Sequence, residues 1–195
     1  YWVYGASGGW EQVENWNIPH IFTEEVTTMS NVLKKGIKTP QGTMPIICGP
    51  QVTGIIAHES CGHPFEADRI LGREAAQAGE SYVQKNMQGK KIGSSIVNIV
   101  DDPTIPNSYG FYLYDNEGVK ARRKILMKQG RVNEFLQNRE TAQQFKTKSN
   151  GSSRASDFEK EPIIRMSNTF ILPGDYKEKE LFEGIKKRVY MKNFM

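Results

Sequence analysis

The stretch Ala57–Asp68, AHESCGHPFEAD, carries two of the three histidines of the chain, at positions 58 and 63. A helix that binds a metal through the pattern H-E-x-x-H places its histidines four residues apart, on one face. Here the spacing is five. Each residue of a regular α-helix turns by about 100°, so His58 and His63 would lie about 140° apart and could not share one ion. The stretch therefore predicts either a locally distorted helix or no metal site.

A distortion of the required kind is available to this stretch. A π-type turn, with hydrogen bonds between residues i and i+5, would bring His58 and His63 over the same face. Gly62 tolerates unusual backbone angles, and Pro64 lacks an N–H donor and clashes with the carbonyl of Ser60. We therefore expect the regular helix to break between the two histidines, where a shared site requires it.

The residue types in the stretch match hydrolytic metal chemistry. Two neutral imidazoles suit Zn²⁺, and a catalytic zinc keeps one position open for a water molecule whose pKa falls toward about 7. Glu59 could accept a proton from that water and pass it to a leaving amine. Glu66 and Asp68 could hold the imidazole N–H groups. Alternatively, the histidines are ordinary polar residues and Glu59 is a solvated charge, because short H-E patterns also arise by chance. The residues alone leave both interpretations open.

No third metal ligand stands out in the sequence. Cys61 lies between the histidines but is expected to point away from their shared face, as a small buried thiol. Cys48 is expected to pack in the core, and His20 to lie in a loop or in the core rather than to bind metal. The ligand set predicted from the residues is therefore incomplete.

Around this stretch, the hydrophobic pattern predicts an α+β protein whose strands are mainly antiparallel and whose sheet encloses the motif helix. An apolar strand that ends at Gly49-Pro50 is expected to lead into the helix that carries His58. Helices are expected at 23–33, after Pro64 as far as Gly72, and at 177–188. Strands are expected at 42–50, 94–103, 109–115 and 167–172, with a hairpin at 122–136 turning at Gln129-Gly130 and a long loop or mobile segment at 147–161.

The composition is that of a globular protein. Of the 195 residues, 37% are apolar and 25% are charged, and no apolar run approaches the roughly 20 residues that a membrane span needs. Two cysteines do not make a disulfide framework, so we expect a reducing compartment, the cytoplasm. The net charge of +4 could suggest nucleic acid, but the basic residues are interleaved with acidic ones, so nucleic-acid binding is not expected. The chain begins with Tyr1 and is expected to be a piece of a longer protein.

Several sequence blocks, in a specific order, resemble those of a known family. The motif HESCGHPFEAD reads as H-E-x-x-x-H followed by E-x-D, and it is followed by DDPTIPNSYGFYLYDNEGVKARRKILMKQGRVNEFLQNRETA, SNGSSRAS and RMSNTFILPGD. From about Gly49 to Asp175 the chain resembles the TldD/PmbA family of metalloproteases, and specifically the TldD-type catalytic subunit. The five-residue histidine spacing matches that of the family.

The resemblance implies a zinc-dependent peptidase with His58 and His63 as ligands and Glu59 as the catalytic base. It also implies a third ligand, a cysteine close to the C-terminus of family members, in a segment that this chain does not contain. Residues 1–195 would form one domain, the core and C-terminal portion of such a protease, with an N-terminal α/β domain and the C-terminal end missing. The expected partner is a PmbA/TldE-like subunit in a homo- or hetero-oligomer, and the expected substrates are flexible peptides or leader segments.

Polar residues outside the motif provide further candidates for substrate contacts. Asn150 and Arg154 belong to a Ser- and Gly-rich loop in which an arginine could hold a peptide carboxylate. Arg165 could polarise a scissile carbonyl beside a cleft. Asp115 and Glu117 are either a polar turn or part of the substrate lining. The competing function is a non-catalytic subunit that binds peptides or a partner without chemistry.

Overall fold

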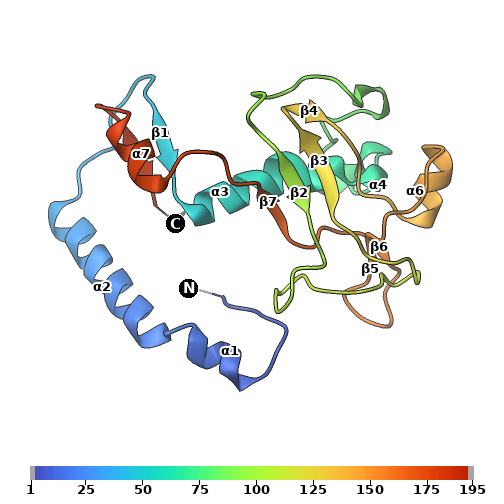
Figure 1. Ribbon diagram of the computed structural model, residues 1–195, viewed down its shortest axis with the longest axis horizontal. Coiled ribbons are helices and arrows are strands. Elements are labelled where there is room, and N and C mark those ends of the chain that lie inside the picture. The colour runs from blue at the N-terminus through green and yellow to red at the C-terminus, as the bar shows by residue number, and fades with distance from the viewer. Residues whose placement is uncertain (1–2, 193–195) are drawn as a thin grey trace.

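The computed structural model describes residues 3–192, and only the backbone of residues 77 and 78. It has the predicted mixture of helices and mainly antiparallel strands (Figure 1). The helices and helical turns are α1 (Trp10–Asn15), α2 (Ile18–Lys35), α3 (Pro50–Ala57), the π-helical turn η1 (His58–Gly62), the 3₁₀ turn η2 (His63–Phe65), α4 (Ala67–Ile70), α5 (Ala75–Ala78), the 3₁₀ turn η3 (Lys85–Met87), α6 (Arg139–Gln144) and α7 (Glu178–Glu183).

The strands form one four-stranded sheet and two small pairs. They are β1 (Ile46–Cys48), β2 (Ile99–Asp101), β3 (Lys124–Lys128), β4 (Arg131–Val132), β5 (Ser153–Arg154), β6 (Ile163–Ile164), β7 (Thr169–Ile171) and β8 (Val189–Met191). The central sheet has the order β4-β3-β2-β7 and is antiparallel throughout, as is the pair β5-β6. Only β1 and β8, among these strands, pair in parallel. The predicted α+β class is confirmed.

The β3-β4 hairpin turns where the sequence predicted it. Gln129 and Gly130 both have positive φ angles, 49° and 70°, as a two-residue type I′ turn requires. Gly130 also packs closely, because a Cβ atom there would lie 2.4 Å from the carbonyl oxygens of Gly93 and Ser94. Both the backbone angle and the close approach therefore demand glycine at this position.

The motif stretch forms part of the hydrophobic core. α3 and η1 pack against β7, and η1 also contacts β3 (Figure 1). Ala57, Cys61 and Phe65, four residues apart, are at most 1% exposed and belong to the same apolar cluster as Leu126 and Ile164. One side of the segment is therefore anchored in the core. His58, Glu59 and Ser60 remain exposed on the other side.

The segment 109–115 is not the strand that its sequence predicted. Tyr109, Leu113 and Tyr114 are each at least 60% exposed, and Phe111 and Tyr112 are half-buried, so the apolar side chains do not line one buried face. The Asp115 carboxylate accepts hydrogen bonds from the backbone N–H groups of Glu117 and Val119, at 3.0 and 2.8 Å. Those bonds bend the chain into a tight turn after the segment, which leaves a single β-bridge, Tyr114 to Lys120.

The segment 147–161, predicted as a long loop or mobile segment, contains a buried and ordered part. Asn150, Ser152 and Ser153 are at most 3% exposed, and β5 lies within the segment. The Asn150 amide donates to the Phe135 carbonyl at 2.7 Å and accepts from the Gln137 N–H at 2.9 Å. The side chain of Asn150 thus provides hydrogen-bond partners for buried backbone groups that none of the strands β1–β8 pairs. Composition alone does not reveal this role.

The helices near the two ends of the chain have other bounds than those predicted. α2 is longer than the predicted 23–33 and ends before Gly36, as expected, but none of its residues is buried. With α1 it lies apart from the four-stranded sheet (Figure 1). The predicted helix at 177–188 is limited to α7, which ends at Glu183 with Gly184 as its C-cap, and β8 follows it to pair with β1. No helix in residues 3–192 is long and apolar enough to cross a membrane.

Candidate metal centre

The helix that carries His58 changes its winding between the two histidines. α3 ends at Ala57, and the next five residues form the π-helical turn η1, closed by a hydrogen bond from the His63 N–H to the His58 carbonyl. This i to i+5 bond accommodates one more residue per turn than a regular helix does. The local distortion predicted from the five-residue spacing is therefore present.

The π turn brings the two imidazoles together. The Nε2 atoms of His58 and His63 lie 3.1 Å apart, and the ring planes meet at 89° with centroids 4.6 Å apart. Two nitrogens bound to one tetrahedral zinc at about 2.0–2.1 Å each would lie about 3.3 Å apart. Adjusting 3.1 Å to that separation needs only a small side-chain rotation, so the pair fits a metal that takes imidazole ligands.

Gly62 has a role in this turn that differs from the predicted one. Its φ and ψ are −56° and −73°, in the ordinary right-handed helical region, so no unusual backbone angle requires glycine. A Cβ atom at this position would instead lie 1.7 Å from the Sδ of Met166. Close packing of Met166 against the turn is therefore the reason for glycine.

Pro64 leaves a carbonyl that another residue satisfies. In a regular helix the N–H of residue 64 would bond to the carbonyl of Ser60, and proline has no N–H. The Tyr82 hydroxyl donates to the Ser60 carbonyl at 2.7 Å, and the Ser81 hydroxyl donates to the Pro64 carbonyl at 2.8 Å. Burial raises the pKa of Tyr82 to about 12. The segment just before η3 thus supports the π turn from outside.

Glu66 holds the second histidine in place. Its Oε2 atom lies 3.2 Å from His63 Nδ1, while the side chain is fully buried. A carboxylate on the far nitrogen fixes the ring orientation and leaves Nε2 free for a metal. The predicted contact of Glu66 with an imidazole is therefore observed in the geometry, for His63.

Two arginines offset the buried charge of Glu66. Arg69 Nε donates to Glu66 Oε2 at 2.7 Å, and Arg165 lies 3.8 Å from the same oxygen. Both arginines also pair with Glu74, at 2.9 and 2.8 Å. The spacing of Arg69, three residues after Glu66, could have been predicted from the sequence. Glu74 and Arg165 reach the site through the tertiary fold, which no local pattern encodes.

Asp68 occupies a different position from the one its spacing suggested. Its carboxylate accepts the backbone N–H groups of Arg69 and Ile164, at 2.9 and 3.3 Å. Burial raises its pKa, and the nearby charge of Glu66 raises it further. Asp68 therefore ties α4 to β6, and no hydrogen bond joins it to an imidazole in residues 3–192.

Glu59 completes a cluster with the histidines. Ligand atoms of His58, Glu59 and His63 all lie within 4.8 Å of one another, the arrangement expected of a metal-binding group. Glu59 Oε1 is 3.9 Å from His58 Nε2, and its side chain is 65% exposed. A carboxylate so placed can reach both the metal position and a water molecule beside it. The pKa of His58 is lowered by burial and then by His63, which favours the neutral imidazole that binds metals.

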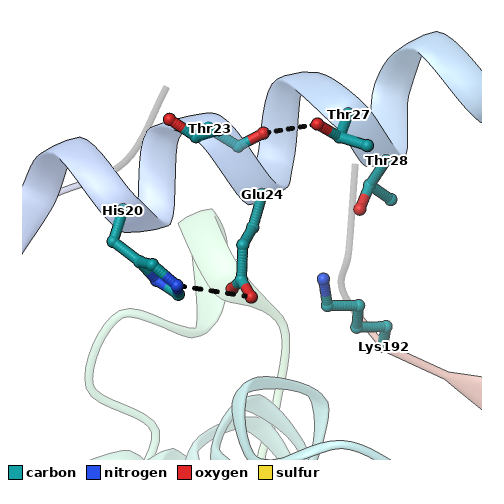
Figure 2. Close-up of a pocket in the computed structure, with 6 residues that line it drawn as sticks. All are labelled: His20, Thr23, Glu24, Thr27, Thr28 and Lys192. Atoms are coloured by element: carbon teal, nitrogen blue, oxygen red, sulfur yellow. Dashed lines mark hydrogen bonds and ion pairs between the residues drawn. The ribbon is translucent and has the colours of Figure 1, made fainter.

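The remaining cysteines and histidine lie outside this cluster. Cys61 is 1% exposed in the core, and burial raises its pKa to about 12, as the predicted buried thiol requires. Cys48 is half-buried at the end of β1. His20 is neither in a loop nor in the core: it is exposed on α2, 3.9 Å from Glu24. Figure 2 shows these two side chains with Lys192 around an open pocket of about 370 Å³.

The three residues predicted to line the substrate site do not lie together. Arg154 and Arg165 share one cavity of about 580 Å³. Asn150 is 3% exposed and bonded to the backbone, so its contacts are those of a residue that holds the fold. Asp115 is likewise a buried turn residue, and Glu117 accepts the Arg139 N–H at 2.9 Å.

The chain is similar to proteins of one family in both sequence and structure. Residues 41–195 match the family described as PmbA/TldA metallopeptidase C-terminal domain. A metalloprotease of Methanothermobacter thermautotrophicus is 37% identical over 188 residues, which is 96% of this chain and 39% of that protein. A zinc metalloprotease TldD homolog of Saccharolobus solfataricus is 37% identical over 159 residues, 80% of this chain and 34% of that protein.

Solved structures show the same fold. The crystal structure of TldE from Thermococcus kodakarensis superposes with a TM-score of 0.62 at 21% sequence identity, over 80% of this chain and 34% of that one. This chain thus spans 39% and 34% of the length of the two relatives named above. From the match over residues 41–195 and the two relatives at 37% identity, the chain belongs to the TldD/PmbA metallopeptidase family.

Proposed function

We propose that the chain carries the metal-binding and catalytic part of a zinc-dependent peptidase that hydrolyses flexible peptides or leader segments. The observation that carries this proposal is the convergence of His58 and His63 to 3.1 Å across a π turn. This geometry requires a local distortion of the helix, and histidines that are only solvated surface residues would not require it. The Saccharolobus relative is named a zinc metalloprotease, in agreement with the proposal.

In this proposal each residue of the cluster has a defined task. His58 and His63 hold the ion through Nε2, and Glu66 keeps the His63 ring oriented through Nδ1. Zinc, when bound, acts as a Lewis acid that polarises a carbonyl and lowers the pKa of water. Glu59 takes a proton from the attacking water and delivers it to the leaving amine. Its exposure leaves it open to substrate.

Two imidazoles do not complete the ligand set of a catalytic zinc, which has three protein ligands. Cys61 is turned into the core and cannot supply the third without unpacking it. We propose that the third ligand comes from outside residues 3–192 and is the cysteine that the family resemblance implies. The proposal for the whole protein also includes a TldE-like partner subunit and a cytoplasmic location.

The test compares three variants of the full-length protein. Zinc per chain is measured by mass spectrometry, and cleavage is followed on an unstructured peptide. We expect His58→Ala to lose both zinc and cleavage. The matched control is His20→Ala, the same change at the other histidine, exposed on α2 away from the cluster; it should retain both. Equal zinc content in these two variants would refute the assignment of the ligands.

Glu59→Gln separates a base from a ligand. If Glu59 acts as the base, the glutamine variant keeps stoichiometric zinc and loses peptide cleavage by a factor of about 10² or more. If Glu59 is itself a ligand, zinc is lost together with cleavage. A variant that cleaves as fast as the parent contradicts both roles.

The second candidate is a non-catalytic subunit that binds peptides or a partner. The observation that favours it is the incomplete ligand set within the described residues. It predicts normal peptide binding by a protein that contains no zinc. Stoichiometric zinc in the purified full-length protein would therefore exclude it.

A further inference from the structure

Four of the nine residues that line a cavity beside the candidate metal centre are cations. The cavity measures about 580 Å³, and its lining includes Arg73, Arg154, Lys160 and Arg165 with a single carboxylate, that of Glu161. The lining therefore carries a surplus of three positive charges. All of the lining residues except Arg73 come from residues 154–166, so the β5-β6 hairpin supplies most of the cavity wall.

Two of the four cations are already neutralised by neighbours. Arg73 pairs with Glu161 at 2.9 Å. Arg165 pairs with Glu74 at 2.8 Å, and its other nitrogen lies 3.8 Å from Glu66. These two arginines hold the wall of the cavity together and are not available as free charges.

The other two cations have no carboxylate partner in residues 3–192. Arg154 Nη1 donates to the Met166 carbonyl at 3.1 Å, and its guanidinium lies over the Tyr112 ring, 5.1 Å from the centroid. These contacts hold the group in position and leave its charge uncompensated. Lys160 is exposed at the rim. A positioned arginine and a free lysine at one cavity suit an anion that arrives from solution.

The cavity lies next to the candidate metal centre. Met166 lines the cavity and also packs against Gly62, inside the π turn. Arg165 lines the cavity and faces Glu66, the carboxylate that holds His63. Met166 and Arg165 therefore connect the wall of the cavity to the residues that position His63.

We infer that this cavity binds a carboxylate of the peptide substrate, through Arg154 and Lys160. The inference rests on the proposed peptidase function and gives it a substrate class: peptides that carry negative charge a few residues from the reacting bond. The carboxylate has two sources, an acidic side chain or the C-terminus of the peptide. Both present the same planar pair of oxygens to the guanidinium.

The test measures binding and not cleavage. Full-length Glu59→Gln protein is titrated into fluorescent peptides of one sequence, made with Glu or Gln at each position in turn and with a free or amidated C-terminus. We expect one Glu to Gln change, or amidation, to weaken binding at least about tenfold, as loss of a charge-assisted hydrogen bond does. Which change does so identifies the source of the carboxylate.

Variants of the cavity connect that preference to the two cations. Lys160→Glu and Arg154→Gln should each weaken the acidic peptide at least about fivefold and leave its neutral counterpart unchanged. Lys160 is exposed and its variant should fold normally, which circular dichroism checks, even if Arg154→Gln does not. Lys90→Glu, the same change at an exposed lysine outside the lining, is the control and should have no effect.

Equal binding of acidic and neutral peptides, or equal effects of Lys160→Glu and Lys90→Glu, would overturn the inference. A single-stranded oligonucleotide that binds the parent and not Lys160→Glu, without any preference among the peptides, would overturn it in favour of phosphate. Because binding is measured with Glu59→Gln, the result does not depend on hydrolysis. If the parent cleaves peptides and binding shows no charge preference, the inference about the cavity fails. If binding is charge-selective and the parent does not cleave, the proposed peptidase function fails.

Discussion

Replacing Gly62 by alanine tests whether close packing, and not backbone freedom, requires glycine in the π turn. The backbone angles of Gly62 suit any residue. The added Cβ atom, however, would lie 1.7 Å from Met166 Sδ. It would also lie 3.0 and 3.1 Å from Cγ and Cε of the same side chain, closer than ordinary van der Waals contact. Gly62→Ala should therefore destabilise the fold and displace the turn that positions His63.

Two opposing contributions determine the magnitude. Glycine to alanine at compatible helical angles stabilises a protein by about 0.4–1 kcal/mol, because the unfolded chain loses freedom. Overpacking a core costs about 1–3 kcal/mol. Met166 is only 8% exposed, so its sulfur cannot move into solvent without exposing apolar surface. The steric cost should dominate, and we expect a net loss of about 1–2 kcal/mol in the free energy of unfolding.

Urea unfolding measures the effect, and Gly54→Ala is the matched control. Gly54 lies in α3, and a Cβ atom there would meet nothing within 4 Å. Its substitution should therefore stabilise the protein by about 0.4–1 kcal/mol. In a double-mutant cycle, Met166→Ala should make room for the new methyl group, with a coupling energy of about 0.5–3 kcal/mol that favours the pair.

The reasoning is refuted if Gly62→Ala is as stable as Gly54→Ala, or if Met166→Ala does not relieve it. A zinc titration of the same variant adds a functional measurement. If the turn shifts, zinc affinity should fall together with stability. Unchanged affinity in a destabilised variant would show that the π turn and the metal ligands are not coupled.

Further predictions concern the charged groups around the site. Glu66→Gln should weaken zinc binding by a factor of about 10–100, measured by competition with a chelator, because His63 loses the carboxylate that orients it; an unchanged affinity would contradict that role. Lys124→Met should lower the free energy of unfolding by about 3–5 kcal/mol, since it leaves Asp101, its fully buried partner at 2.9 Å, as an unpaired charge; a variant as stable as the parent would show that the hydrogen bonds to Asp101 suffice. The Asp68 pKa is raised by burial, so the native state binds its proton more tightly than the unfolded state and stability falls as the pH rises from the unfolded-state pKa through the folded-state pKa. Asp68→Asn should flatten this part of the curve of unfolding free energy against pH. If the parent instead becomes more stable as the pH rises, and Asp68→Asn removes that increase, the expected sign is wrong.

The sequence predicted features that depend on neighbouring residues. The five-residue histidine spacing and Pro64 predicted the π turn, and Gln129-Gly130 predicted the hairpin turn. Both depend on backbone geometry within a few residues, which the residue types determine locally. The burial of Cys61 followed in the same way, from its position on the opposite side of the helix.

Features that depend on tertiary partners were not predictable in the same way. The segment 147–161 has the composition of a loop, yet Asn150 is buried because Phe135 and Gln137 supply its partners. The segment 109–115 has the pattern of a strand, yet in residues 3–192 its only β-pairing is the bridge from Tyr114 to Lys120. Asp68 has the spacing of a histidine partner and bonds to Ile164 instead, 96 residues away. In each case the deciding group is remote in the sequence.

The two histidines differ in how firmly the protein holds them. The difference arises because His63 has tertiary partners in addition to the local turn, whereas the His58 ring has none in the described part of the chain. His63 is fixed by the π turn through its backbone and by Glu66 through its ring, with two arginines behind that carboxylate. Within residues 3–192, the polar partners of the His58 ring are His63 and Glu59 only. A π turn alone could bring two rings to the same face, but it would leave both free to rotate. The buried carboxylate removes that freedom from one ring, at the cost of a desolvated charge that the arginines offset. In the proposed site His63 is therefore the preformed part, and His58 would be the ligand that adjusts when a metal binds.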